Sequence, residues 1–332
     1  SLMAFSVQGR DVSISKGRIE GYRNFMNKIW NASRFAIQAL PENFSPQQHP
    51  QPRTLADTWI QNQLHETVQK SRKALDQFRF NEYAECLYQF VWHEFCDWYL
   101  ELAKVHLYGE DENLKNSCAQ NLIYVLEEIL VLMHPVCPFI TELLWKTIPG
   151  NKDLPSVMLR SYPKSENIPS ADPKTLLEMQ GLQELITGIR TIRSENTIPP
   201  KTKLKLILGS IQTELKASDL EKHRNYLTQL ANLEEISFEG KAPDNNSAIF
   251  RGDYFQAWVP LEGLIDNASE ITRLEKKIEK IQKDIAFLSG KLCNEKYIKN
   301  APLHLVERDQ KKLKKSQEDL AKVEKSIQKL QS

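Results

Sequence analysis

A line of cations and aromatic rings runs along the segment RIEGYRNFMNKIWNASRF, residues 18–35. Its members recur at helical steps and so share one side of a helix: Arg18, Phe25, Lys28, Ala32 and Phe35. Rings that stack on unpaired bases, set among cations that meet phosphates, are typical of single-stranded nucleic-acid binding. The alternative is that Phe25 and Phe35 only widen the buried face of this helix. We call this set the cation–ring stripe.

A second candidate for chemistry is the pair His93 and Cys96 in HEFC, which has the spacing of half a metal site. No second pair follows at zinc spacing, so we predict no metal and interpret the pair as a packed cysteine beside a surface histidine. The five cysteines, of which Cys96 is one, are scattered and contain no C-x-x-C pair. This usage is typical of reduced thiols, and with no apolar run of roughly 18 residues it predicts a cytoplasmic protein outside the membrane.

The elements that must position the cation–ring stripe are helices, and the first carries its own apolar core line. That line recurs at steps of three and four: Ile19, Tyr22, Met26, Ile29, Ser33, Ala36 and Leu40. Further helices are predicted from Thr54, from Asn81 as N-cap, and over 112–134. Pro135 and Pro138 then break the chain before a short helix to Trp145. Residues 1–153 are therefore predicted to be a bundle of four or five helices.

Two different regions follow the bundle. Four prolines and many small polar residues between 154 and 173 predict a linker with one short strand. Residues 174–263 then read as helix 174–196, strand 203–209, helix 214–232, strand 234–240 and two strands within 248–261. This order predicts a small α+β module, so the fold class is mainly α with one mixed sheet.

The last segment, residues 264–332, has an unbroken heptad seam followed by a looser one. The first seam contains Ile271, Leu274, Ile278, Ile281, Ile285, Leu288 and Leu292, and the second resumes at Val306 after Pro302. Two seams around a proline-containing turn predict an antiparallel coiled-coil hairpin. It holds 16 Lys and Arg against 11 Asp and Glu, a net charge of +5, whereas the whole chain carries +1. A basic arm is thus attached to a mildly acidic body, although lysine-rich coiled coils are often simply solvated.

Several runs resemble the anticodon-binding bundle of bacterial valine–tRNA ligases, which are class I aminoacyl-tRNA synthetases. The runs are EGYRNFMNKIWNASRF, LADTWI, FVWHEFCDWYLELAK and HPVCPFITELLW, and the later IRTIRSENTIPP and NEKYIKNAP resemble the α+β region and C-terminal hairpin of that family. Ligases for isoleucine, leucine and methionine share runs similar to HPVCPFITE. FCDWYLEL together with the coiled coil favours the valine family over the equivalent region of an isoleucine or leucine ligase.

The resemblance implies a tRNA-recognition role without catalysis in this chain. The family's His-Ile-Gly-His-type and Lys-Met-Ser-Lys-Ser-type motifs, which bind ATP and activate the amino acid, are absent, and so is the editing domain. We therefore expect no catalytic residue and no cofactor here, with ATP and magnesium belonging to the parent enzyme. The parent is expected to be a valine–tRNA ligase, and the partner a valine-specific tRNA rather than DNA.

The resemblance also assigns residues at matching positions. Lys28 and Phe35 would lie near the anticodon bases, joined by Leu100 and Glu101 at the end of DWYLE and by Arg18, where the alignment is loose. The arm would lean on the outer corner of tRNA, where the D and T loops meet, through candidates that are Lys276, Lys280, Lys283, Lys291, Lys296, Tyr297 and Lys299. We expect a monomer, because an intramolecular hairpin satisfies its own seam. The competing interpretations are a coiled-coil interaction protein without RNA binding and, resting only on His93 and Cys96, a metal enzyme.

Overall fold

The fold was analysed in a computed structural model of all 332 residues. The structure describes residues 2–5, 15–149, 154–210, 214–238, 240, 243 and 247–261, together with short runs between 278 and 320. The chain divides into two compact units: residues 1–194 with 199–260 form the first, and residues 195–198 with 261–332 form the second. The sequence-based domain limits at 153, 173 and 263 stay predictions.

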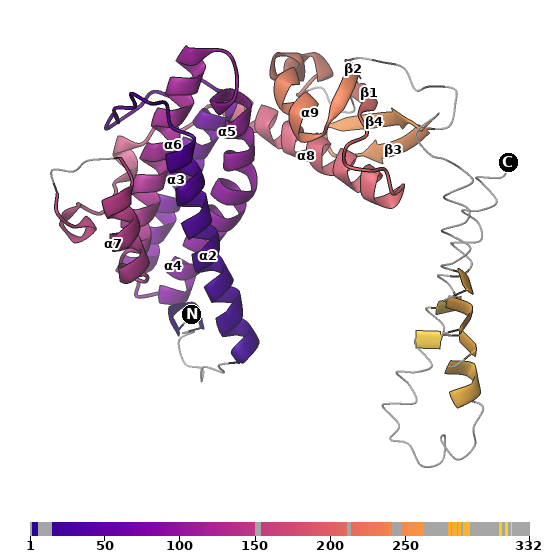
Figure 1. The fold of residues 1–332 in the computed structure, drawn as a ribbon, viewed down its shortest axis with the longest axis horizontal. Helices are drawn as coiled ribbons and strands as arrows, with labels where there is room; N and C mark the ends of the chain where they lie inside the picture. Colours follow the sequence, from indigo (N-terminus) through magenta and orange to yellow (C-terminus); the bar gives the residue numbers. More distant parts are fainter. Residues whose placement is uncertain are drawn as a thin grey trace. The chain divides into compact units, whose positions relative to one another are not determined.

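The first part of unit 1 is the helical bundle that the apolar spacing predicts (Figure 1). It contains α2 (Lys16–Gln38), α3 (Leu55–Asp76), α6 (Glu112–Met133) and α7 (Pro138–Thr147). Between α3 and α6 runs one continuous helix made of α4 (Phe80–Tyr88), the π-helical segment η1 (Gln89–Tyr99) and α5 (Leu100–Leu107). A short helix, α1 (Leu2–Phe5), packs against α4. The five long helices confirm the predicted bundle of four or five, and α1 is a short helix that the sequence analysis did not predict.

Helix α6 lies in the interior of the bundle. Every residue from Cys118 to Met133 is buried, including the polar Gln120 and Asn121, whose amides donate to backbone carbonyls. Its first turn is closed by Asp111, whose carboxylate accepts from the backbone N–H groups of Asn113 and Leu114. A helix buried on all sides needs apolar residues around its whole circumference, which explains the nearly continuous run LIYVLEEILVLM.

Two sequence-based details of the bundle are wrong. Asn81 is not an N-cap, because the third helix begins one residue earlier at Phe80, after Arg79, with no side-chain cap. Ile19 was predicted to face the core, yet it is 48% exposed, whereas Ile29 further along α2 is 1% exposed. The apolar line is continuous along α2, but the described helices fully bury its members only from Ile29 to Ala36.

The segment 154–173 holds no strand among its described residues, which corrects the prediction of one there. It forms two 3₁₀ turns, Val157–Leu159 (η2) and Ser165–Asn167 (η3), and buries Val157 and Ile168 against the bundle. Arg160 donates to the buried carboxylate of Glu128 on α6 over 2.8 Å. Arg72 of α3 donates to the backbone carbonyls of Tyr162 and Pro163. These contacts tie the segment to two helices of the bundle.

The α+β module follows. Its elements are α8 (Pro173–Glu195), β1 (Leu204–Ser210), the 3₁₀ segment η4 (Ala217–His223), α9 (Arg224–Leu230), β2 (Leu233–Ser237), β3 (Ser247–Arg251) and β4 (Phe255–Pro260). The sheet has the order β2-β1-β4-β3, with β1 and β2 parallel and the other two pairs antiparallel. All four predicted strands are confirmed. The predicted helix 214–232 is shorter and is divided between η4 and α9.

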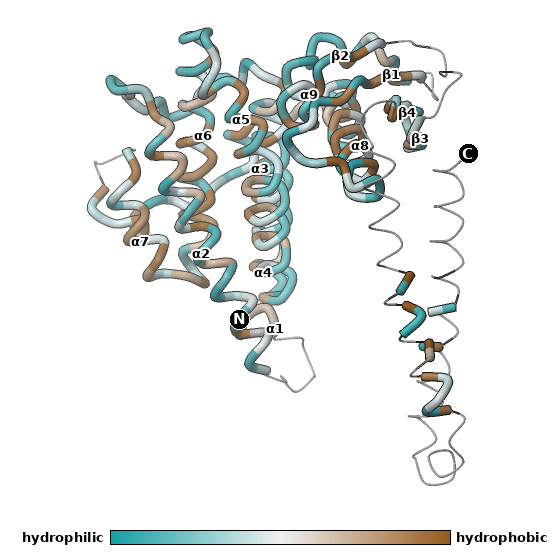
Figure 2. The backbone as a smooth tube through the Cα atoms, turned by 45° about the vertical axis from the view of Figure 1, so that its right-hand side comes forward, coloured by the Kyte–Doolittle hydropathy of each residue, from teal (hydrophilic) through white to brown (hydrophobic). Residues whose placement is uncertain are grey.

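Helix α8 packs closely on the sheet, and its hydrophobic stretches are visible in Figure 2. The close approach is permitted by two glycines. A Cβ atom at Gly188 would come within 2.6 Å of the Phe250 ring on β3, and one at Gly181 within 2.9 Å of the Phe255 ring on β4. The rings of the sheet therefore occupy the space that helix side chains would otherwise fill.

Arg193, in the last turn of α8, fastens two loops of the module. Its guanidinium donates to the carbonyls of Thr202 at 2.8 Å, Ala231 at 2.9 Å and Asn232 at 2.8 Å, with a longer bond to Pro199. Asn232 has a positive φ of 51°, in the left-handed region that asparagine adopts more readily than most residues. The fork geometry of arginine allows one side chain to satisfy carbonyls from two loops.

Replacing Arg193 by alanine is expected to destabilise the module by about 2–4 kcal/mol, since part-buried carbonyls lose a charged donor. Calorimetric melting temperatures would measure the effect. The control is Arg190→Ala, because Arg190 lies one turn earlier and makes one long hydrogen bond, of 3.5 Å to the Leu230 carbonyl, beside a ring contact with Trp98 at 5.8 Å. Equal melting temperatures for the two variants would contradict the role assigned to Arg193.

A buried carboxylate lies where the bundle meets α9. Asp57 of α3 is fully buried and accepts a hydrogen bond from the Tyr99 hydroxyl at 2.8 Å, while its second oxygen lacks a partner among the described residues. Burial raises the pKa of Asp57 from its usual 3.8 to about 6. Nearby, the Tyr226 hydroxyl of α9 lies 2.8 Å from His106 Nε2 of α5. The bundle and the module are thus joined through polar side chains.

The stability of the chain is expected to depend on pH through Asp57. The folded state holds its proton more tightly than the unfolded chain, so this stabilisation is present below pH 3.8 and is lost as pH rises through about 6. The difference amounts to about 3 kcal/mol. Asp57→Asn should remove this dependence, which urea unfolding at pH 4, 5, 6 and 7 would measure. An unchanged slope between pH 4 and 6 in the variant would contradict the assignment.

Candidate nucleic-acid interface

Lys28 lies at the rim between α2 and η1, half-buried. Its ammonium group donates to the Asp97 carboxylate and stands 4.0 Å from the centre of the Trp92 ring. The other oxygen of Asp97 is 3.3 Å from His93 Nδ1. A carboxylate and an aromatic face therefore hold the lysine at a fixed place on the surface, although its charge is partly neutralised.

The π-helical geometry of η1 explains how two of its residues reach the same lysine. In a π-helix the hydrogen bonds run between residues five apart, so such residues lie on neighbouring turns of one side. Trp92 and Asp97 are five apart, and both contact Lys28. The sequence analysis assumed an α-helix here and did not single out either residue, and no signal in the segment indicated the wider turn.

A second cluster surrounds Phe35, which is also half-buried. The Lys104 ammonium lies 5.2 Å from the centre of the Phe35 ring and 2.6 Å from Glu101 Oε1. Lys104 thus brings together two residues that the resemblance selected, Phe35 on α2 and Glu101 on α5. Sequence reasoning missed Lys104, although its spacing of three from Glu101 is typical of an ion pair on a helix.

The remaining members of the cation–ring stripe do not form an exposed line with Lys28 and Phe35. Phe25 is 5% exposed and packs against Tyr88 at 5.0 Å and Trp92 at 6.0 Å between ring centres. Ala32 is 6% exposed. The alternative interpretation, that a ring of this stripe widens the buried face, is therefore confirmed for Phe25. The backbone of Arg18 lies in α2, and its side chain is outside the described residues.

Leu100, the last of the residues that the resemblance assigns to the bundle, starts α5 and is only 7% exposed. It lies directly before Glu101, so its side chain packs inward while the carboxylate next to it stays at the surface. Its contact with tRNA, like that of the other assigned residues, stays a prediction.

The arm is described at short helical runs only. Five residues of the first predicted seam are helical and half-buried there: Ile278, Ile281, Ile285, Leu288 and Leu292. Lys283 is exposed and pairs with Glu279 at 2.6 Å, and Lys291 is helical and half-buried. The other predicted contacts, Lys276, Lys280, Lys296, Tyr297 and Lys299, lie outside the described residues, as does the turn at Pro302.

His93 and Cys96 differ in their exposure to solvent. His93 is half-exposed beside Asp97, whereas Cys96 is buried, and burial raises the pKa of its thiol to about 12. In the parts of the chain that the structure describes, no three His, Cys, Asp or Glu side chains lie together as a metal site requires. Among the same residues, no helix has the length and apolarity to cross a membrane.

Comparison with known families accounts for both the bundle and the arm. Residues 57–208 match the family described as the anticodon-binding domain of tRNA ligases. Residues 266–331 match the valyl-tRNA synthetase tRNA-binding arm. The chain belongs to the valine–tRNA ligase family. The two matches follow one another along the chain in the same order as the predicted bundle and hairpin.

Relatives within the valine–tRNA ligase family match almost the whole chain. The valine–tRNA ligase of Syntrophotalea carbinolica is 38% identical over 335 residues, covering 99% of this chain and 37% of the relative. The valine–tRNA ligase of Geobacter sulfurreducens is 41% identical, covering 94% of this chain and 35% of the relative. The valine–tRNA ligase of Aquifex aeolicus is 35% identical, covering 100% of this chain and 29% of the relative. The chain thus spans about a third of the length of these ligases.

Proposed function

We propose that this chain recognises the tRNA on behalf of a valine–tRNA ligase, with the rim between α2, η1 and α5 contacting the anticodon loop. The observation that carries the proposal is the pairing of a ring and a cation twice along this rim. Lys28 stands beside Trp92, and Lys104 stands beside Phe35. Stacking on an aromatic face and neutralisation of phosphate are the two interactions that single-stranded RNA requires.

Each side chain has a role that its present contacts support. Phe35 stacks on an unpaired anticodon base, and Lys104, whose ammonium lies over the ring at 5.2 Å from its centre, meets the adjacent phosphate. Lys28 donates to a base edge or phosphate while Asp97 and Trp92 hold its position. Glu101 is paired with Lys104 in the free chain and accepts from a base amino group in the complex, as readout of base edges allows.

The arm is proposed to contact the outer corner of the tRNA, where the D and T loops meet. Its net charge of +5 suits phosphate neutralisation, and the family match at residues 266–331 supports tRNA as its partner. Lys276, Lys280, Lys283, Lys291, Lys296 and Lys299 are the candidate cations, with Tyr297 packing on an exposed base. The chain is proposed to act as a monomer in the cytoplasm.

The whole polypeptide is proposed to attach valine to its tRNA at the expense of ATP with magnesium, held by regions that this chain does not span. Binding energy gained at the anticodon orients the distant acceptor end, and so it raises the catalytic efficiency there rather than here. Activation of valine by this purified chain would contradict the division of roles.

The test is binding of the chain to valine tRNA and to the same tRNA with a substituted central anticodon base. Fluorescence anisotropy at two salt concentrations should show salt-dependent affinity that the base substitution lowers. Equal affinity for both tRNAs would mean that the arm dominates and that the bundle does not read the anticodon. Absence of binding to either would favour the coiled-coil interaction protein instead.

A further inference from the structure

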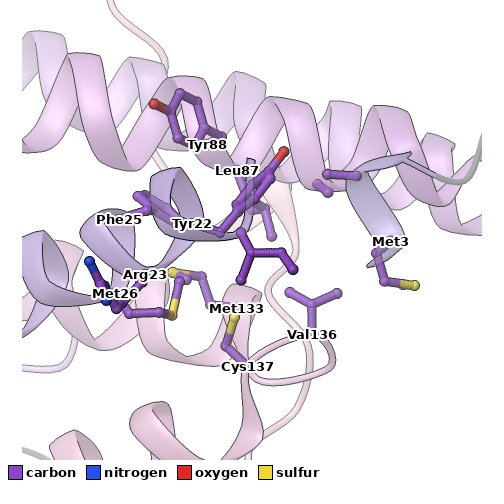
Figure 3. Close-up of a pocket in the computed structure, with 13 residues that line it drawn as sticks. Met3, Tyr22, Arg23, Phe25, Met26, Leu87, Tyr88, Met133, Val136 and Cys137 are labelled. Atoms are coloured by element: carbon purple, nitrogen blue, oxygen red, sulfur yellow. The ribbon is translucent and has the colours of Figure 1, made fainter. Parts of the chain in front are cut away.

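An apolar groove of about 580 Å³ opens on the bundle. Two of its lining residues, Phe25 and Tyr88, also pack against Trp92, so the groove adjoins the Lys28–Trp92 pair. Its walls come from α1, the first half of α2, α4 and the turn after α6. Figure 3 shows Tyr22, Leu87 and Tyr88 on one side and Met26, Met133 and Cys137 on the other. Arg23 is the one charged residue among the described side chains that line it. Such a surface is suited to an apolar protein segment and not to RNA.

The groove continues the buried stripe of α2. Ile19, Tyr22 and Met26 follow the same helical spacing as Ile29 and Ala36, which are 1% and 0% exposed. Ile19, by contrast, is 48% exposed, and Tyr22 and Met26 are half-buried. The helix therefore carries core-type residues along a line that the described part of this chain covers only at one end.

The occupant is indicated by the length of polypeptide outside the chain. The related ligases are about three times as long as the matched region, so roughly two thirds of such a protein lies outside it and can cover its surface. Short helix α1 already packs against α4, and its Met3 and Ala4 line the groove. Segments of the same polypeptide thus fit this surface, and interfaces that never dissociate are apolar like a core.

We propose that this groove binds the part of the full-length ligase that lies outside this chain, so that the contact is an interface within one polypeptide. The inference rests on the proposed function insofar as it takes the full-length protein to be a ligase of this family. Ile19, Tyr22 and Met26 form the contact surface, and Arg23 at the rim pairs with a carboxylate or carbonyl of the covering segment.

Hydroxyl-radical footprinting of the full-length ligase and of the 332-residue chain tests the proposal directly. Oxidation of Ile19, Tyr22 and Met26 is expected to fall at least fivefold in the full-length protein, whereas Ile249 on β3, which is 54% exposed, serves as the reference. Equal oxidation in both proteins would overturn the inference. Protection in the 332-residue chain that rises with its concentration would also overturn it, because a second copy would then be the occupant.

A pair of variants gives an independent test. Ile19→Glu and Ile249→Glu both place a charge at an exposed isoleucine, so neither should greatly change the melting temperature of the 332-residue chain. In the full-length ligase, Ile19→Glu should accelerate tryptic separation of the two parts at least tenfold, and Ile249→Glu should leave the rate unchanged. Equal rates for the two variants would overturn the inference.

The outcome is separable from that of the proposed function, because tRNA binding by the chain is measured on its own. A chain that binds valine tRNA and whose groove is equally oxidised in both proteins would refute the covered groove alone. A protected groove in a protein whose chain does not bind tRNA would refute the tRNA role alone.

Discussion

Alanine in place of Phe35 is expected to weaken binding of the chain to valine tRNA by about 5- to 150-fold, the range of one lost base-stacking contact. The ring is half-buried on α2, and the Lys104 ammonium lies 5.2 Å from its centre. A base stacked on the exposed part of the ring would therefore have its phosphate close to a cation. Truncation removes the stacking face and leaves the cation, and affinity should therefore fall while the salt dependence of binding stays the same.

Two further variants make the expectation specific. Phe35→Tyr retains the aromatic face and should keep affinity within a few-fold of the original chain. Phe78→Ala removes a 70% exposed ring at the end of α3, outside the cation–ring stripe, and should leave affinity unchanged. If Phe78→Ala were as harmful as Phe35→Ala, or if neither had an effect, Phe35 would have no stacking role. Circular dichroism of each variant would confirm that the helices persist.

Alanine in place of Arg160 is expected to cost about 3–5 kcal/mol of stability, the largest effect on the fold that we predict. Its partner Glu128 is 5% exposed on α6, so removing the guanidinium leaves a carboxylate without its cation in the interior. Burial already raises the pKa of Glu128, against the opposing effect of Arg160. The loss should therefore be greatest at neutral pH and should shrink as pH falls and the carboxyl becomes protonated.

A double-mutant cycle measures this pair. Glu128→Gln together with Arg160→Ala should recover much of the stability that Arg160→Ala loses, because no charge then remains buried. Calorimetric melting of the four proteins at pH 5 and pH 7 would give the comparison. A double variant no more stable than Arg160→Ala would show that lost packing of the 154–173 segment, and not the unpaired carboxylate, causes the destabilisation.

Most of the helices and strands could be predicted because their signals are local. The helix expected from Thr54 is α3, whose first turn the Thr54 hydroxyl caps by accepting from the Asp57 backbone N–H, and all four strands expected in the module are present. The features that the sequence did not predict depend on tertiary contacts. The hydrogen-bond pattern of η1 depends on packing and leaves no mark in the residue types, and the 3₁₀ turns of 154–173 depend on contacts with Glu128 and Arg72.

The candidate site could be predicted only in part. Sequence spacing selected Lys28 and Phe35, but it also selected Phe25 and Ala32, which the bundle buries. The partners that give the site its geometry, Trp92, Asp97 and Lys104, lie between 64 and 69 positions away from Lys28 or Phe35, the residues of α2 that they contact. No local pattern connects residues so far apart.

The sequence by itself determined the helical spacing of α2, the order of bundle, module and heptad segment, and the membership in the valine–tRNA ligase family. Only the tertiary structure decided which members of the cation–ring stripe reach the surface. Neighbouring residues on one helix differ in exposure because other helices pack at particular angles against it, as α4 and η1 do against Phe25 and beside Lys28. Periodicity defines the side of a helix, and packing defines how much of that side is covered.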